Sequence, residues 1–544
     1  MASLFLSPLL PLALVLIVAP ASAQSQATPD PQLPKGCTAI STASEADEAL
    51  YAEDWGKATR LYRDKLKENP ASLEAQAGLI RVALGQDRVS DAETTALAMV
   101  KEAPRSVVAQ TTLGEVYIWR GEIELAPAQL TKALALDPCY ARAHYAEGRL
   151  ATLMGYHAMA ARQLAIAHAL TPQDSQTAVA WMFTLPPDQR FPLLKQFLNN
   201  VKYLNEDDRE DLKSQVTEGE LRMNSECTVT APQGGTHVPL YVAPVLSKDP
   251  GRPTVDLTIN GSKHRAFFDT STNGVDLPWK TGKRLGLTPL AHVSYALLYT
   301  GGRLNYYLAK VDSLRIGDVE YRNCIVSIRD ESAEDAGYQL ESINLTGADM
   351  GIGATFLSDF MIRVDAPAKT LALTPLPPAQ GPEVDATGLP MWSNAGHGTP
   401  QTVRSINGGS WGQYNRTVSP EMKDWTPLFR YRNETWVATK IGAGPSLLFE
   451  LELSNPWPRI ATTASTSYTK LENTGSGTPP FKGYFMSFGG MYIPVSSWTA
   501  ERWDEYSKHL KLETSGTIGQ DALRQVSFTL DLRDNLVKFE RAKQ

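Results

Sequence analysis

Four prolines recur at a fixed interval in the first third of the chain, and this period limits the possible fold more than any other feature. The prolines are Pro70, Pro104, Pro138 and Pro172, at a constant interval of 34. An alanine lies twelve residues before each of them, at Ala58, Ala92, Ala126 and Ala160. Helical hydrophobic patterns such as AQLTKALAL fill the intervals. The period predicts stacked helix pairs, because one pair cannot bury its apolar face without its neighbours.

This repeat, with small residues at the helix crossings and a proline at the turn, resembles the tetratricopeptide repeat over residues 37–172. The resemblance implies an all-α solenoid whose surface holds a protein partner; the alternative is a rigid spacer without a ligand. Residues 173–227 keep a helical pattern and are expected to cap the solenoid and connect it to the rest of the chain. His144, His157 and His168 are too widely spaced for a close metal pair, so we expect no metal and no cofactor.

The first residues have the pattern of a secretory signal. An apolar run from Leu9 to Val18 precedes the small residues Ala21-Ser22-Ala23, and cleavage is expected after Ala23. We therefore expect residues 1–23 to be a signal peptide and the protein to be secreted or periplasmic. The run is too short and proline-broken to span a membrane well, and no later segment has the apolar length of a membrane helix. No membrane span is expected after signal removal.

Charge and cysteine content narrow the partners and the redox chemistry. The formal net charge is -7 and no basic patch stands out, which argues against nucleic acid as a partner. The four cysteines are Cys37, Cys139, Cys227 and Cys324. They show no CxxC spacing, which argues against a zinc site. In an exported chain they form two disulfides, in one of three pairings, or remain as buried thiols.

Strand patterns replace helical patterns in residues 228–378. Asn260-Gly261 predicts the turn of a β-hairpin, and the second strand of that hairpin ends in FFDTST, which contains Asp269 and Thr270. A GIG segment, a helix, a strand ending in aspartate and a final strand follow later. In this order, the segments resemble a retropepsin-like aspartic protease lobe.

The resemblance implies that Asp269 is a catalytic carboxylate and that Thr270 braces the loop that carries it. The family has glycine where this chain has Ser271, whose Cβ and hydroxyl restrict the close approach that glycine allows. The segment LLYTGGRLNYY has a glycine turn suited to a flap over a substrate. Its candidate substrate-binding residues are Tyr299, Gly301 and Gly302. One lobe is half of an enzyme, because the mechanism needs two carboxylates about 3 Å apart that share one proton.

A second, altered copy of the lobe is expected in residues 391–544, after a proline-rich linker at 379–390. Aligning TIGQDALRQVSFTLDL with GIGATFLSDFMIRVDA gives an offset of 166 in residue number. The catalytic position of this copy falls at Glu452, and Leu453 replaces the threonine. Glutamate reaches one methylene further, and a misplacement of roughly 1 Å can cost about a hundredfold in rate. The alternative is that Glu452 is a surface or salt-bridged glutamate in a strand.

The expected fold class is multidomain α and β, with an α-solenoid of TPR helix pairs and an all-β, pepsin-like double lobe. One function is the binding of a peptide or protein in the inter-lobe cleft by a catalytically degenerate body. A second is an active aspartic endopeptidase that uses Asp269 with an unconventional partner such as Glu452. A third is a structural envelope scaffold, because fold alone does not decide function. Two chains could also pair their Asp269 residues, but the second lobe would occupy that docking face.

Overall fold

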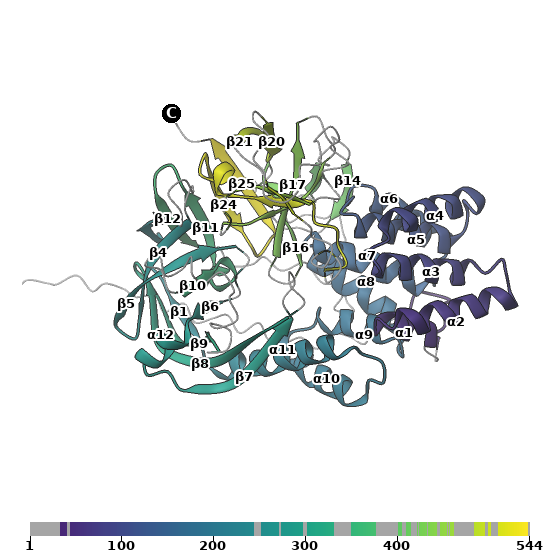
Figure 1. The fold of residues 1–544 in the computed structure, drawn as a ribbon, viewed down its shortest axis with the longest axis horizontal. Helices are drawn as coiled ribbons and strands as arrows, with labels where there is room; N and C mark the ends of the chain where they lie inside the picture. The colour runs from purple at the N-terminus through teal and green to yellow at the C-terminus, as the bar shows by residue number, and fades with distance from the viewer. Residues whose placement is uncertain are drawn as a thin grey trace, which may run out of the picture.

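The computed structural model describes residues 33–40, 44–243, 252–270, 272, 274–296, 302–330, 350–376, 401–404, 410–414, 422, 424–431, 434–442, 446–453, 455, 457–461, 484–495, 499–501, 507 and 510–541. An α-helical part lies on one side of the molecule and two β-rich lobes lie on the other (Figure 1). The predicted signal peptide and linker fall outside the described residues. None of the helices that the structure describes combines the length and the apolar content needed to cross a membrane.

The helical part is built from antiparallel pairs. Its helices are α1 (Glu45–Tyr51), α2 (Trp55–Glu68), α3 (Leu73–Gly85), α4 (Val89–Glu102), α5 (Val107–Trp119), α6 (Ala126–Leu136), α7 (Ala141–Leu153), α8 (His157–Leu170), α9 (Ser175–Met182), α10 (Pro187–Asn200) and α11 (Glu206–Asn224). The helix caps follow the sequence period, because Ser72 and Ser106, one period apart, accept hydrogen bonds from Ala75 N–H and Ala109 N–H. The predicted solenoid of helix pairs is confirmed.

The solenoid is curved so that its first helix, α1, contacts its ninth, α9. Glu48 of α1 accepts hydrogen bonds from the backbone N–H of Ser175 in α9 at 2.8 Å and from its hydroxyl at 2.6 Å. The segment before α1 is tied to the repeats by the Cys37–Cys139 disulfide. The other two cysteines form the Cys227–Cys324 disulfide, so the structure selects one of the three possible pairings.

The first lobe is a sheet in the order β1-β9-β6-β10-β5-β4-β8-β7, with β3 paired to β4. Its strands are β1 (Thr228–Thr230), β3 (Tyr241–Ala243), β4 (Arg252–Ile259), β5 (Ser262–Asp269), β6 (Val275–Leu277), β7 (Pro289–Ala296), β8 (Arg303–Ile316), β9 (Val319–Arg329) and β10 (Met350–Gly353). Helix α12 (Trp279–Arg284) and the 3-10 helix η1 (Ala354–Leu357) accompany the sheet. Asn260 and Gly261 have φ of 47° and 81°, which confirms the predicted hairpin turn between β4 and β5.

The second lobe is a sheet in the order β21-β20-β17-β18-β23-β19-β22, with β16 paired to β17. Its strands are β16 (Phe429–Tyr431), β17 (Glu434–Ile441), β18 (Leu447–Leu451), β19 (Arg459–Ala461), β20 (Tyr484–Phe488), β21 (Met491–Val495), β22 (Thr499–Glu501) and β23 (Gly516–Ile518). A separate ribbon pairs β13 (Gln401–Arg404) with β14 (Ser410–Tyr414). In each lobe, a strand from late in the sequence lies between two earlier strands, parallel to the first and antiparallel to the second. Strand β10 lies between β5 and β6 in the first lobe, and β23 lies between β18 and β19 in the second.

A six-stranded sheet joins the lobes in the order β15-β25-β24-β11-β12-β2. Its strands are β2 (Thr236–Pro239), β11 (Phe360–Asp365), β12 (Thr370–Pro375), β15 (Thr426–Pro427), β24 (Val526–Asp531) and β25 (Leu536–Arg541), and α17 (Gln520–Leu523) precedes β24. Arg363 of β11 pairs with Thr529 of β24, its own equivalent at an offset of 166. The joint is therefore a pseudo-twofold axis, as in a dimer of identical units. The same offset relates Ile362–Leu373 to Phe528–Phe539.

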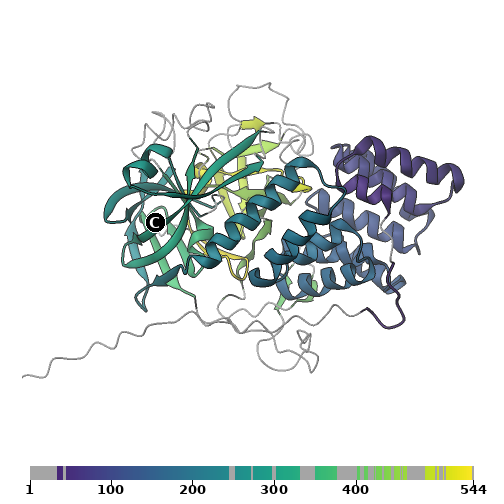
Figure 2. The ribbon, with the colours of Figure 1, turned by 90° about the horizontal axis from the view of Figure 1, so that it is seen from below.

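The helical part packs against both lobes. Glu513 N–H of the second lobe donates to Trp119 O at the end of α5, and Arg149 of α7 donates to Lys511 O. Helix α11 lies along β7, where the Ser214 hydroxyl donates to a strand carbonyl at 2.9 Å. One buried apolar cluster includes Leu150 of the solenoid together with residues of both lobes. Figure 2 shows the last of these helices, α11, lying across the β part. The solenoid is thus packed into the body of the molecule.

Candidate functional site

Asp269 is the last residue of β5, at the centre of the first lobe. Its side chain is 8% exposed. One carboxylate oxygen, Oδ1, accepts a hydrogen bond from Thr270 N–H at 2.7 Å, and Oδ2 accepts one from the Thr272 hydroxyl at 3.2 Å. The parallel partner of Asp269 is Gly353 of β10. The predicted catalytic carboxylate is therefore held in a fixed position at the end of a buried strand.

Glycine is required where the later strand passes the loop after Asp269. A Cβ on Gly353 would lie 1.7 Å from Thr272 O. In the second lobe, a Cβ on Gly519 would lie 2.4 Å from the Trp457 carbonyl carbon. Gly353 and Gly519 are related by the offset that relates the two lobes, so the same close backbone approach occurs in both copies.

The strand registers fix which residue of the second lobe corresponds to Asp269. Ile352 pairs with Phe268 in the first lobe, and Ile518 pairs with Leu451 in the second. Leu451 therefore corresponds to Phe268, and the next residue, Glu452, corresponds to Asp269. This agrees with the register predicted for Glu452. Its side chain is partly exposed and accepts a short hydrogen bond from the Asn455 amide.

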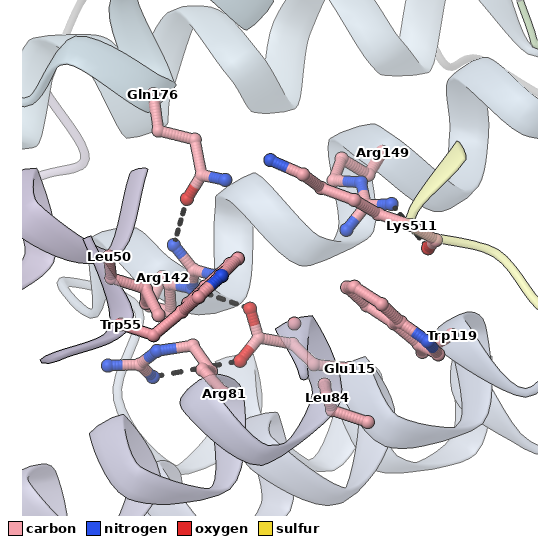
Figure 3. A pocket seen from close by; sticks show the side chains of 11 residues that line it. Leu50, Trp55, Arg81, Leu84, Glu115, Trp119, Arg142, Arg149, Gln176 and Lys511 are labelled. Atoms are coloured by element: carbon pink, nitrogen blue, oxygen red, sulfur yellow. Dashed lines mark hydrogen bonds and ion pairs between the residues drawn. The ribbon is translucent and has the colours of Figure 1, made fainter. Parts of the chain in front are cut away.

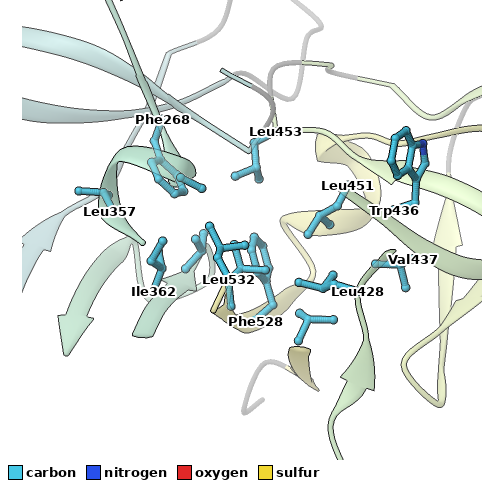
Figure 4. Packing of buried hydrophobic residues seen from close by; sticks show 14 of the residues in the cluster. Phe268, Leu357, Ile362, Leu428, Trp436, Val437, Leu451, Leu453, Phe528 and Leu532 are labelled. Atoms are coloured by element: carbon cyan, nitrogen blue, oxygen red, sulfur yellow. The ribbon is translucent and has the colours of Figure 1, made fainter. Parts of the chain in front are cut away.

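Thr270 joins the two lobes across the site. Its hydroxyl donates a short hydrogen bond to Leu451 O, the carbonyl that immediately precedes Glu452. By the pseudo-twofold relation, the reciprocal bond would run from residue 453 to Phe268 O. Leu453 has no hydroxyl and is 1% exposed, packed in the same apolar cluster as Phe268 (Figure 4). One of two symmetric inter-lobe hydrogen bonds is thus replaced by apolar packing.

Two residues near the site were missed by the sequence reasoning. Glu450 lies two positions before Glu452 in β18 and is 1% exposed. Side chains two apart in a strand share a face, so the alternating pattern FELEL was the available signal for a second acid on this face. Asn455 is the other missed residue, because no local pattern shows that its amide reaches Glu452.

The predicted flap is described only from Gly302 onward. Ser271, Tyr299 and Gly301 lie outside the described residues, and Gly302 is exposed immediately before β8. At the outer end of the β7–β8 hairpin, Arg303 donates to Asp207 and Asp211 of α11, at 2.8 and 2.7 Å. The stem of the predicted flap is therefore anchored to the last helix of the α-helical part.

A ladder of alternating charges lines the inner face of the solenoid, and Figure 3 shows three of its members, Arg81, Glu115 and Arg149. It occupies one position in four successive repeats: Asp47, Arg81, Glu115 and Arg149. Arg81 lies 3.2 Å from Asp47 and 3.7 Å from Glu115. Burial alone would raise the pKa of Asp47, but Arg81, with Tyr62, holds that pKa below its usual value.

The space beside this ladder is small. Lys511 of the second lobe lies on one side of it, where its carbonyl accepts a hydrogen bond from Arg149, and the volume is about 50 Å³ (Figure 3). This volume is far below the roughly 300 Å³ at which small-molecule sites begin, so the space does not suit a peptide. Among the described residues, no cluster of three or more His, Cys, Asp or Glu side chains could hold a metal ion.

Comparisons with known proteins agree with these two parts. Residues 255–349 match a family model described as aspartyl protease, and residues 49–111 match a tetratricopeptide repeat model. The chain contains a TPR region followed by an aspartic-protease-like region. A comparison with curated proteins gives no significant match.

Two solved structures illustrate the similarity. A thermophilic TPR protein from Thermus thermophilus is 26% identical over 32% of this chain and 95% of that chain, with a TM-score of 0.26. A retropepsin-like aspartic protease from Rickettsia conorii is 18% identical over 27% of this chain and 92% of that chain, with a TM-score of 0.18.

Proposed function

We propose that the double lobe binds an extended peptide or protein segment where the lobes meet, and that its catalytic pair is degenerate. The observation that carries this proposal is the difference between two equivalent strand ends, Asp269-Thr270 in one lobe and Glu452-Leu453 in the other. An extended ligand suits a body made of sheets, because strand edges offer backbone hydrogen bonds to it.

Catalysis by this kind of site depends on two carboxylates held about 3 Å apart, so that they share one proton. Glu452 has a longer side chain than aspartate and accepts a hydrogen bond from Asn455, which directs one of its oxygens along its own loop. Leu453 lacks the hydroxyl that Thr270 uses to fix the opposite loop. Both differences loosen the geometry on which proton sharing depends.

The second candidate is an active aspartic endopeptidase that uses Asp269 and Glu452. One observation favours the endopeptidase: by the strand registers, the residue equivalent to Asp269 is also an acid. In this case Glu452 would serve as the unconventional partner carboxylate, and cleavage would be slow and acid-dependent.

We further propose that the protein is exported and that the solenoid recruits a protein partner on its outer surface. The inner face near α5 and α7 is an unsuitable place, because Lys511 of the second lobe lies against it and the space beside it is about 50 Å³. A purely structural scaffold is the remaining alternative and would show neither binding nor cleavage.

The test measures cleavage and capture on the same protein. The purified chain is incubated with an unfolded protein and with a library of extended peptides from pH 3 to pH 7, with and without pepstatin. The variants are Asp269→Ala and, as a matched control, Asp256→Ala, which removes an exposed acid of β4. We expect saturable peptide binding without turnover in the wild type and in the control variant.

Three outcomes separate the functions. Pepstatin-sensitive cleavage at acidic pH that disappears in Asp269→Ala and persists in Asp256→Ala would overturn the degenerate binder and establish the protease. Peptide capture without cleavage supports the proposal. Neither capture nor cleavage would leave the scaffold as the function of the double lobe.

A further inference from the structure

Helix α11 covers the outer edge of the first lobe's sheet. Strand β7 is the last strand of that sheet, so one side of its backbone has no neighbouring strand among the described residues. Helix α11 lies along this side (Figure 1). An uncovered edge offers unpaired N–H and C=O groups to any extended segment, and a helix laid over it is one way in which proteins protect it. The contacts between α11 and β7 decide how firmly this edge is covered.

The side chains of α11 bond to the β7 backbone at the positions that an added strand would use. The Ser214 hydroxyl donates to Ser294 O and accepts from Ser294 N–H, both at 2.9 Å. Two residues further along β7, the Ala296 N–H donates to Asp211 Oδ1 at 3.0 Å. In an antiparallel sheet, alternate residues direct their N–H and C=O groups to the same neighbour. Two side chains of a helix therefore satisfy the backbone groups that would bind an extended ligand.

Charged and aromatic side chains also hold α11 to the β7–β8 hairpin. Arg303 of β8 donates to Asp207 at 2.8 Å and to Asp211 at 2.7 Å. The Tyr295 hydroxyl of β7 donates to Glu218. The α11 residues in these contacts are three or four positions apart and so share one face of the helix. We call this polar face the latch stripe, and it consists of Asp207, Asp211, Ser214 and Glu218.

A different face of α11 is apolar and packs against α10. Leu212 and Val216 are buried in a cluster with Phe191 and Leu194 of α10. A Cβ on Gly219 would lie 1.9 Å from the Phe191 ring, so the two helices are in close contact there. Apolar burial thus holds α11 to α10, whereas the latch stripe bonds to β7 and β8 through polar groups, which can exchange their partners for water. Loss of the contacts to β7 would leave the contacts to α10 in place.

The C-terminal end of α11 is attached to the first lobe by other contacts. Leu221 packs against a small apolar cluster that contains Ile325 of β9. Arg222 donates to Ile325 O at 3.0 Å. The Cys227–Cys324 disulfide then links β9 to the segment that follows the helix. A separation of α11 from β7 would therefore begin in the N-terminal half of the helix and pivot at this end.

We propose that α11 is a releasable latch on the first lobe: its N-terminal half leaves β7, and the freed edge pairs with the backbone of an extended ligand. The latch stripe is then a built-in competitor of that ligand. This inference rests on the proposed function, because the ligand is the extended peptide segment proposed above. It adds the strand edge that binds the segment and the helix that regulates access to this edge.

Competition of this kind makes a quantitative prediction. If only the released form binds the ligand, the apparent dissociation constant equals the intrinsic constant divided by the fraction of released molecules. A substitution that makes release about tenfold more frequent must therefore tighten ligand binding about tenfold. A contact that only supports the fold has no such relation, and its loss does not improve binding.

The first measurement is hydrogen exchange of the purified chain, read at the Ala296 amide at several low urea concentrations. Ser214→Ala removes two bonds of the latch and leaves the bond from Ala296 to Asp211 in place. We expect Ala296 to exchange about tenfold faster in this variant, because the latch loses hydrogen bonds that oppose its release. This exchange should depend little on urea, since release exposes little surface, whereas exchange of the β5 amides should depend on urea steeply.

The second measurement is the affinity of the same proteins for the peptides of the capture experiment. Ser214→Ala should bind them about tenfold more tightly than the wild type, by the same factor as its faster exchange. Arg303→Met, which removes the ion pairs to the latch stripe, should act in the same direction. Thr217→Ala is the matched control, because it removes a hydroxyl from the exposed side of α11 and should change neither quantity.

Two results would overturn the latch. One is exchange at Ala296 that follows urea as steeply as exchange in β5, because α11 would then leave β7 only when the lobe unfolds. The other is equal peptide affinity of Ser214→Ala and the wild type, because the edge of β7 would then take no part in binding. If no variant captures a peptide, the proposed function fails, and exchange at Ala296 still decides whether the latch opens.

Discussion

The two lobes have the same arrangement of strands and differ in the side chains where those strands end. In both lobes a strand from late in the sequence, β10 or β23, lies between two earlier strands. Each of these strands ends in or next to a glycine, Gly353 or Gly519, where the backbone passes closely by a loop. The first lobe has Asp269-Thr270 at that point, and the second has Glu452-Leu453. The shared framework is held by backbone pairing and burial, which tolerate many side chains. The chemistry depends on particular side-chain atoms and has diverged.

The differences extend beyond the central pair. Asp276 of β6 pairs with Gly351, and the equivalent pair in the second lobe is Arg459 with Thr517, so an acid in one lobe corresponds to a base in the other. The Cys227–Cys324 disulfide links β9 of the first lobe to the segment between α11 and β1. Because four cysteines form two disulfides elsewhere in the chain, the second lobe has no such link.

The glycine pair should give the largest effect. Gly353→Ala is expected to destabilise the protein by more than about 4 kcal/mol, since the new Cβ meets a backbone oxygen at 1.7 Å. Gly519→Ala should cost somewhat less, about 3 kcal/mol, because its nearest contact is 2.4 Å. Urea unfolding of both variants measures this. Gly56→Ala, whose Cβ would meet only one atom at 3.8 Å, is the control and should be neutral or slightly stabilising. If alanine is tolerated at Gly519 but not at Gly353, the close backbone approach is not shared and the correspondence of the lobes fails.

Removal of the disulfide of the first lobe should come next. Cys227 and Cys324 are 97 residues apart, and the loss of a disulfide typically costs about 2 to 4 kcal/mol, because the unfolded chain regains conformational freedom. The double variant Cys227→Ala/Cys324→Ala should therefore unfold its first lobe at a lower urea concentration. Hydrogen exchange of the β9 amides measures this unfolding. If the amides of β17 and β18 in the second lobe lose protection to the same degree, the two lobes unfold as one unit. Their stabilities can then not be compared separately.

The buried ion pair of the first lobe should show a pH dependence. Arg329 lies 2.6 Å from Asp276, and burial raises the pKa of Asp276 although Arg329 opposes this. Arg329→Met leaves the acid without its cation and should cost about 3 kcal/mol near pH 8. A raised carboxyl pKa means that the folded state binds more protons, so stability falls as pH rises above the unfolded value near 4. The deficit should thus shrink when unfolding is measured at pH 4. A deficit that is the same at both pH values contradicts this account.

The inter-lobe hydrogen bond should give the smallest effect. Thr270→Val keeps the shape but leaves Leu451 O without its donor, at a cost of about 1 to 2 kcal/mol. Thr270→Ser retains the hydroxyl and should recover most of that stability in the same thermal unfolding measurement. If the serine variant is as unstable as the valine variant, the methyl group of Thr270, and not its bond across the lobes, contributes the stability.

Much of the framework could be predicted from the sequence. The constant spacing of the prolines gave the helix pairs, and the Asn260-Gly261 turn gave the first hairpin. The offset between the two copies placed Glu452 at the position of Asp269, and the strand registers agree. These inferences succeeded because period, turn chemistry and repeated order are local or one-dimensional properties of the chain.

Other features of the site could not be predicted, because they depend on residues far apart in the sequence. The bond from Thr270 to Leu451 O spans 181 positions, and the burial of Glu450 depends on strands that pair around it. The contact between Glu48 and Ser175 and the contact between Arg149 and Lys511 also join residues that are far apart in the sequence. No local pattern reports the distance between such groups.

By itself, the sequence determined which segments are helices and strands and that one lobe is followed by an altered copy, because hydrophobic period and glycine positions act within a few residues. The tertiary structure decided how these parts contact one another: which cysteines pair, which carbonyl accepts the Thr270 hydroxyl, and which side chains of the lobes face the solenoid. Those outcomes follow from packing, which brings together backbone and side-chain groups whose separation along the chain carries no information about their separation in space.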